Sequence, residues 1–190
     1  ITGSGLGSGI LVDGYNNVVI KNCNIQNFYY GMNIVNAKGT QIIGGNNLQL
    51  NDFYGIYLYN TNRTLIEDNI LINDNNGVYM IDTIYTNITN NTINLQKKFY
   101  GIYGFKSTYN LIENNTLYDN YHGIYLLNSS YTNATANNIS SSDKNSVFLH
   151  KGTSYSRFVN NNLTTALEGI RTRENSIGNK FIGNQIEDHE

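Results

Sequence analysis

The sequence contains no proline and no tryptophan, and its only cysteine is Cys23. A single cysteine allows no disulfide framework within these residues, so we expect Cys23 to be a small buried side chain. Charged residues make up 14% of the chain, and the net charge is −2 without any basic run. We therefore expect no nucleic-acid partner, which would need a basic stripe. No stretch approaches the ~20 apolar residues of a membrane span, so none is expected.

Glycine, in contrast, recurs at a nearly constant interval along the chain. Successive members of the series are 22, 24, 22, 24, 22 and 46 residues apart, and Ser146 lies at the midpoint of the last, doubled interval. The series is Gly9, Gly31, Gly55, Gly77, Gly101, Gly123 and Gly169. A fixed period of this length is the signature of a solenoid.

Residues 55–76 show how one repeat is organised. Apolar residues and tyrosines alternate over 55–59, which is the periodicity of a strand. Two more short apolar segments follow at 64–66 and 70–72, and Asn- and Asp-rich turns separate the three. Because 22 residues leave no room for a crossover helix, each strand must stack on its equivalent in the next coil, forming parallel ladders.

Aligned columns predict a narrow interior. The third-strand column is predicted to point inward with Ile25, Leu48, Ile70, Ile93, Leu117, Ile139, Leu163 and Ile186. Asparagine makes up 35 of the 190 residues, and it precedes this column at Asn24, Asn47, Asn69, Asn138 and Asn162, or one place earlier at Asn91 and Asn115. Stacked amides can hydrogen-bond from coil to coil, so we predict an asparagine ladder.

The repeated pattern Gly-Ile-Tyr-Leu…Asn…Ile-x-x-Asn-x-Ile resembles the right-handed parallel β-helix repeat of the pectate-lyase-like superfamily. The same repeat occurs in carbohydrate-binding and sugar-hydrolase domains and in the β-helix proteins of nitrous-oxide-reductase maturation. The resemblance covers residues 9–186 and implies an all-β, single-stranded right-handed β-helix of about eight coils of 22–24 residues, with three short strands per coil. It implies little about activity, because this fold carries many functions.

The chain shows no break in composition, so residues 1–190 are predicted to form one domain. Residues 1–8 would be a partial coil or linker, and residues 9–186 the repeats. Because neither end shows the cap that solenoids normally need, we expect a segment of a longer chain or a processed chain.

The outward side chains of the first strand are the clearest candidate for a binding surface. If Ile56 and Leu58 point inward, the alternating positions point outward. The candidate partner-binding residues are Tyr57, Tyr59, Tyr79, Tyr103, Phe105, Tyr125 and Phe148. Such a patch is large enough to need an explanation. Three remain open: a neighbouring chain or domain covers it, a glycan stacks on it, or the rings stiffen the ladder.

Acidic residues support an alternative prediction, that the chain is an enzyme or binds a cation. Asp52 and Asp74 fall in one column just before the glycine, ~5 Å apart if they are stacked. They are either solvated corner residues or a shallow acidic site that binds calcium. Apart from this calcium alternative, no cofactor is expected.

The histidines give little support for catalysis or metal binding. His122 and His150 occupy different columns, and neither lies at metal-ligand spacing from a second histidine or a methionine, so copper binding is not supported. The Tyr-Gly-x-Asp-Pro-His motif of the alginate epimerases and the Gly-His-Gly motif of the polygalacturonases are both absent.

Eight Asn-x-Ser/Thr triplets are candidate glycosylation sites, only slightly more than composition alone predicts. They begin at Asn62, Asn87, Asn90, Asn114, Asn128, Asn133, Asn138 and Asn162.

The sequence therefore predicts a non-catalytic extracellular or cell-surface module, with a periplasmic location as a further option. Its role would be structural or adhesive, with the tyrosine-rich face meeting a protein neighbour, further domains of the same chain, or a glycan. Coil length varies by only about two residues, which leaves no long insertions to build a deep pocket. The alternative is a polysaccharide lyase or hydrolase with a shallow acidic site.

Overall fold

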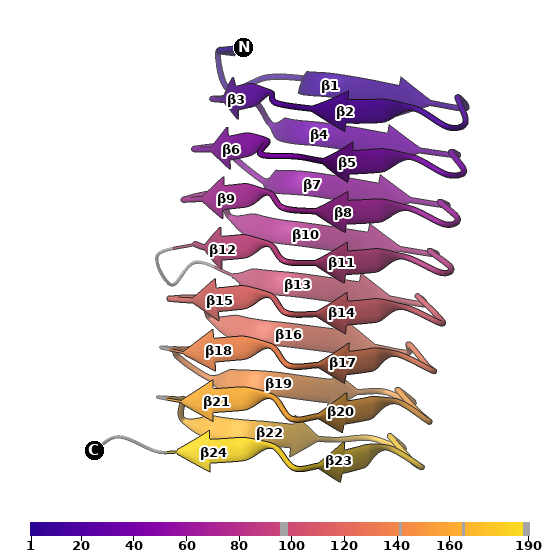
Figure 1. Cartoon of the computed structure of the whole chain (residues 1–190), viewed down its shortest axis with the longest axis vertical. Helices are drawn as coiled ribbons and strands as arrows, with labels where there is room; N and C mark the ends of the chain where they lie inside the picture. Colours follow the sequence, from indigo (N-terminus) through magenta and orange to yellow (C-terminus); the bar gives the residue numbers. More distant parts are fainter. Residues whose placement is uncertain (96–98, 141, 165, 188–190) are drawn as a thin grey trace.

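The fold is a rod of stacked coils in which every strand pairs with its equivalent one coil away (Figure 1). The computed structural model describes residues 1–95, 99–140, 142–164 and 166–187. These residues form 24 strands in three parallel sheets of eight strands each. Within the described ranges no helix is long and apolar enough to cross a membrane. The prediction of a parallel β-helix of about eight three-stranded coils is confirmed.

The long sheet carries the strands of five or six residues and lies behind the other two sheets in Figure 1. Its strands are β1 (Ser8–Asp13), β4 (Tyr30–Val35), β7 (Tyr54–Tyr59), β10 (Asn76–Ile81), β13 (Tyr100–Phe105), β16 (His122–Leu127), β19 (Asn145–His150) and β22 (Glu168–Thr172).

The other two sheets are made of three-residue strands. The second sheet contains β2 (Val19–Lys21), β5 (Gln41–Ile43), β8 (Leu65–Glu67), β11 (Asn87–Thr89), β14 (Leu111–Glu113), β17 (Asn133–Thr135), β20 (Arg157–Val159) and β23 (Lys180–Ile182). The third sheet contains β3 (Asn24–Gln26), β6 (Asn47–Gln49), β9 (Ile70–Ile72), β12 (Thr92–Asn94), β15 (Thr116–Tyr118), β18 (Asn138–Ser140), β21 (Asn162–Thr164) and β24 (Gln185–Glu187).

The core is one apolar cluster that runs the length of the rod. Two inward residues per long strand and one per short strand build it, since side chains alternate across a strand. Large and small residues compensate between coils: Ala134 pairs with Phe158, and both are fully buried. The glycine column is packed equally tightly. A Cβ atom added to Gly101 would lie only 2.7 Å from the carbonyl oxygen of Gly123. Ser146 occupies its expected place in this column and is buried.

The third sheet corrects one predicted position of the core. Leu71, not Ile70, pairs with Leu48 and Ile93 and is fully buried, whereas Ile70 is 43% exposed. Three consecutive apolar residues hide the period-2 pattern in this strand. The inward residue follows the ladder asparagine by two places, as Leu71 follows Asn69, because both side chains must point to the same side.

The predicted asparagine ladder exists, although its members differ from those expected. Asn69, Asn91 and Asn115 belong to it, but Asn24, Asn47, Asn138 and Asn162 lie one place too late in the chain and are not among its buried members. The side-chain amides of the ladder donate from one coil to the next over 2.8–3.1 Å. Its members are Asn46, Asn69, Asn91, Asn115, Asn137, Asn161 and Asn184.

Each rung of the ladder also satisfies backbone groups. The side-chain amide of Asn115 donates to the carbonyl of Ile88 at 2.8 Å, while its oxygen accepts the backbone N–H of Asn91 at 2.9 Å. Cys23 takes the position of the first rung, and its N–H donates to the side chain of Asn46. Its side chain packs against the core but is only partly buried, so the expected burial of Cys23 is confirmed only in part. Buried polar groups need such partners, which explains the asparagine content.

Candidate functional site

The outer side of the long sheet carries the surface that the sequence singles out, which we call the aromatic face. All seven candidate binding residues lie on it, in two neighbouring columns. One column runs through Tyr57, Tyr79, Tyr103, Tyr125 and Phe148. The other includes Tyr59, Ile81, Phe105 and Leu127.

Rings of the first column contact one another from coil to coil. Tyr79 and Tyr103 stack with centroids 4.3 Å apart, and Tyr125 and Phe148 stack at 4.8 Å. The stacking buries Tyr103 to 7% exposure, whereas Tyr59 in the second column is 41% exposed. Burial is the main cause that raises the pKa of Tyr79, Tyr103 and Tyr125, so their hydroxyl groups stay protonated as hydrogen-bond donors.

A third column of rings lies beside these two, at the start of each long strand. Tyr30 stacks on Tyr54 with centroids 5.4 Å apart, and Tyr100 stacks on the ring of His122 at 5.9 Å. Between the two pairs the column is interrupted, because Asn76 occupies this position in β10. The sequence prediction of the binding surface included neither this column nor its gap.

The interruption leaves a cavity of about 220 Å³, which we call the notch. Its lining residues are Phe53, Tyr54, Asn75, Asn76, Tyr79, Phe99 and Tyr100. Phe53 and Phe99 are 43% and 49% exposed and form its outer rim. The side-chain nitrogen of Asn76 donates to the carbonyl of Phe53 at 3.0 Å, but its buried oxygen has no hydrogen-bond partner within the described part of the chain.

A triad of Tyr125, His150 and Glu174 lies further along the aromatic face. The Tyr125 hydroxyl lies 2.7 Å from Nδ1 of His150, and Nε2 of His150 lies 3.0 Å from a carboxylate oxygen of Glu174. In the neutral tautomer that carries its proton on Nε2, Nδ1 of His150 accepts the hydrogen bond that the Tyr125 hydroxyl donates. The hydrogen bond to His150 holds the pKa of the Glu174 carboxyl below its usual range. Sequence reasoning missed this triad because its members come from three successive coils.

The other histidine, His122, is buried among rings rather than paired with an acid. Its ring lies 5.6 Å from that of Phe148, and it is 8% exposed. Burial, with smaller contributions from the positive charges of Lys144 and Arg171, lowers the pKa of His122 to about 4. His122 is therefore neutral at physiological pH.

The predicted column of Asp52 and Asp74 is not formed. Asp74 is fully buried and accepts the backbone N–H of Asn51 at 2.8 Å and its side-chain amide at 3.0 Å. Asp52 is exposed and lies one residue further along its coil, at the level of Asn75. The coil from 51 to 74 has 23 residues, so counting from the glycine misaligns the two aspartates. Because the Asp74 carboxylate is buried and bonded to the Asn51 amide, the two aspartates do not form the shared outward site that was predicted.

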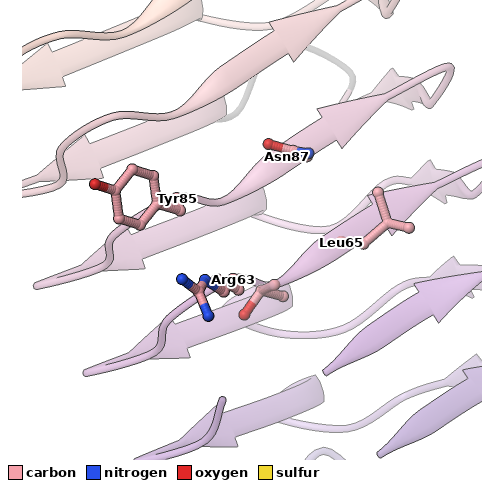
Figure 2. A pocket seen from close by; sticks show the side chains of 5 residues that line it. Arg63, Leu65, Tyr85 and Asn87 are labelled. Carbon is pink, nitrogen blue, oxygen red and sulfur yellow. The ribbon is translucent and has the colours of Figure 1, made fainter. Parts of the chain in front are cut away.

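An open cavity of about 410 Å³ lies at the corner between the long and second sheets. Figure 2 shows Arg63 and Tyr85 near one another at its edge, with Leu65 and Asn87 on the adjacent strands. Tyr85 begins a corner column of stacked tyrosines, in which the rings of Tyr109 and Tyr131 are nearly parallel with centroids 4.8 Å apart. This column lies at the corner of the coils, on a different side of the rod from the aromatic face.

The candidate glycosylation residues lie at the surface, but exposure alone does not test modification. The exposed ones are Asn87, Asn90, Asn114, Asn128, Asn133 and Asn138, and the partly buried ones are Asn62 and Asn162. Their glycosylation stays a prediction.

No group of three or more His, Cys, Asp or Glu side chains suited to a metal occurs among the described residues. Both methionines, Met32 and Met80, are fully buried in the core. Calcium binding stays untested, but the pair of aspartates on which it rested is not assembled.

A family model described as "Periplasmic copper-binding protein (NosD)" matches residues 1–139 and 106–190, which together span the whole chain. The chain belongs to the NosD family. This match confirms the predicted resemblance to β-helix repeats. The family is described as periplasmic, which agrees with the expected location outside the cytoplasm but does not define it further. No curated protein matches the chain significantly.

Solved structures show the same fold at low sequence identity. The periplasmic alginate epimerase AlgG is 17% identical with a TM-score of 0.86, over 94% of this chain and 47% of its own. The A-module of the Azotobacter vinelandii mannuronan C-5 epimerase AlgE4 is 13% identical with a TM-score of 0.80, over 91% of this chain and 60% of its own. The chain thus spans about half the length of AlgG, and these likenesses show the fold alone.

Proposed function

We propose that the chain is a periplasmic binding module whose aromatic face holds a polysaccharide. The observation that carries this proposal is the run of outward rings over successive coils, from Tyr57 to Phe148. Flat rings stack on the apolar faces of sugar rings, and stacked coils repeat every ~5 Å along one line. The protonated tyrosine hydroxyls supply polar groups at the edges of the rings. Such a linear array suits an extended chain of sugars.

The names of the structural neighbours suggest the first ligand to test. Both AlgG and AlgE4 are named as enzymes that act on alginate or mannuronan, which are linear uronate polysaccharides. Arg171 lies over the Phe148 ring at 5.6 Å at one end of the aromatic face, where its guanidinium is paired with Glu168 at 3.0 Å, so an anionic sugar would compete with this carboxylate. We therefore take alginate as the anionic probe and an unsubstituted glucan as the neutral probe.

The test is gel electrophoresis of the protein through alginate or glucan, which retards a binding protein. We expect wild type to be retarded, and a Tyr57→Ser/Tyr125→Ser variant to lose most of the retardation. The matched control is Tyr109→Ser/Tyr131→Ser, which removes two stacked tyrosines from the corner column instead. Equal behaviour of the two double variants, or no retardation of wild type by either polysaccharide, contradicts the proposal. In that case, assembly of wild type that the face variant abolishes would support a protein partner.

A second candidate function, proton transfer on a uronate, is favoured by the Tyr125–His150–Glu174 triad. Lyases and epimerases of uronates both begin by removing the proton on the carbon next to the carboxylate. In this candidate the tyrosine, after passing its proton to His150, would take that substrate proton. The raised pKa of Tyr125 works against this role, so binding is the preferred function. Formation of unsaturated uronate from alginate by wild type, lost in Tyr125→Phe, would support it.

Copper binding, which the family description names, does not fit the described side chains. The methionines lie inside the core, and His150 is engaged by Tyr125 and Glu174. His122 is enclosed by rings, and the described residues include no group of three or more His, Cys, Asp or Glu side chains that could hold a metal. We therefore assign no copper site to these residues.

A further inference from the structure

We propose that the notch between Phe53–Tyr54 and Phe99–Tyr100 is a subsite that takes one pyranose ring of the bound polysaccharide. This inference rests on the proposed function, and it locates the tightest contact within the aromatic face. Neither Tyr57 nor Tyr125, which the function test removes, lines the notch, although each ring packs on one of its walls with centroids 5.1 Å apart.

The first argument is the spacing of the rings. Tyr29 stacks on Phe53 at 4.5 Å and Tyr30 stacks on Tyr54 at 5.4 Å, so the rings on one side of the notch follow the coil repeat. The next rings of these columns belong to Phe99 and Tyr100, two coils from Phe53 and Tyr54. Two coils span ~10 Å. One flat ring at the missing level would lie ~5 Å from each neighbour, which is the stacking distance of the rest of the column.

The second argument is the polar group at the base of the notch. Asn76 is 7% exposed, and its side-chain oxygen has no hydrogen-bond partner among the described residues although its nitrogen is satisfied. A buried acceptor without a donor costs free energy, so its presence requires an explanation. A sugar hydroxyl that enters the notch would donate to this oxygen.

The unpaired side-chain oxygen of Asn76 also distinguishes between the possible occupants of the notch. A phenylalanine or aliphatic side chain of a protein partner would fill the space but leave the Asn76 oxygen unpaired. A pyranose ring offers apolar faces to the two walls and hydroxyl donors at its edge. The volume of about 220 Å³ and the exposed rim of Phe53 and Phe99 leave an open side through which the polysaccharide can continue. A pyranose therefore matches both the walls and the base.

The test fills the missing level with a side chain of the protein itself. In Asn76→Tyr the new ring would occupy the place of the sugar and continue the stack. The probes are alginate oligosaccharides and glucan oligosaccharides, with affinity measured by titration calorimetry on the same protein that is retarded in gels. We expect Asn76→Tyr to weaken binding about tenfold or more, and Asn133→Tyr, the same exchange on an exposed position of the second sheet, to bind like wild type.

A second variant tests the notch even if Asn76→Tyr fails to fold. Phe99→Ser removes one exposed wall of the notch, and Tyr155→Ser removes an equally exposed ring from the corner column as its control. We expect weaker binding only for Phe99→Ser. If both notch variants bind like wild type while Tyr57→Ser/Tyr125→Ser does not bind, the notch is no subsite and the proposed function survives. If wild type binds neither set of oligosaccharides, both proposals fail.

Discussion

Two stacks of side chains run along this rod, and they differ in continuity. Inside, the asparagine ladder continues without a gap from Asn46 to Asn184, and each amide is satisfied by the next. Outside, the aromatic column at the start of the long strands is interrupted at Asn76. The ladder must be continuous because a missing rung leaves buried polar groups unpaired. The aromatic stack lies on the outer side of the long sheet, where the gap is open at the exposed rim of Phe53 and Phe99 and leaves room for a ligand.

The largest expected effect comes from breaking the inner ladder. Asn115→Leu would leave the carbonyl of Ile88 and the amide of Asn91 without their buried partner. We expect the free energy of unfolding to fall by about 3–5 kcal/mol, since each unsatisfied group costs about 1–3 kcal/mol. Chemical denaturation measures the change. The control is Asn133→Leu, the same exchange at an exposed strand position of β17, and equal losses in the two variants would contradict the structural role of the ladder.

A smaller effect is expected from pH, through His122 in the outer column. Its folded-state pKa of about 4 lies below the ordinary value of 6.5. As pH falls, the unfolded chain therefore binds the proton first. The stability is full above about pH 6.5 and is lost between 6.5 and 4, by roughly 2–3 kcal/mol.

The measurement for this prediction is the unfolding free energy of wild type and His122→Phe across this pH range. The phenylalanine keeps a ring between Tyr100 and Phe148 but cannot titrate. The difference between the two proteins isolates the histidine from other titrating groups. A difference that does not change with pH would show that burial leaves the pKa of His122 unshifted.

The smallest effect on stability is expected from the outer rings themselves. Tyr57 is only partly buried, and its ring is 6.1 Å from that of Tyr79, a looser contact than others in the column. We expect Tyr57→Ser to lower the free energy of unfolding by only about 1 kcal/mol, while it weakens polysaccharide binding. A loss as large as that of Asn115→Leu would make the aromatic face a structural stack rather than a binding surface.

Much of the fold could be predicted because repetition makes it visible in the sequence. The glycine interval sets the coil, and even Ser146 was located in the glycine column. Errors arose where coils differ by one residue in length. Counting from the glycine placed Asp74 beside Asp52 and Ile70 in the core, whereas the hydrogen bonds of Asn51 and Asn69 set the actual register.

The candidate site could be predicted only in part. The alternation of inward and outward side chains within each strand was enough to place Tyr57 and Tyr125 on the outer side of the long sheet. The contact of His150 with Glu174 depends on a turn conformation and on side-chain directions across coils, which a linear pattern does not contain. The notch was missed for another reason: it is marked by the residues that the column lacks, at Asn75 and Asn76.

The most direct test of the central claim is an NMR titration of the wild-type protein with alginate oligosaccharides, followed through assigned aromatic ring signals. Binding along the aromatic face predicts that the rings of Tyr57, Tyr79 and Tyr125 shift and that those of Tyr54 and Tyr100 at the notch shift most. The corner rings of Tyr109 and Tyr131 would stay unchanged. Shifts limited to the corner column, or no shifts at saturating oligosaccharide, would contradict the account.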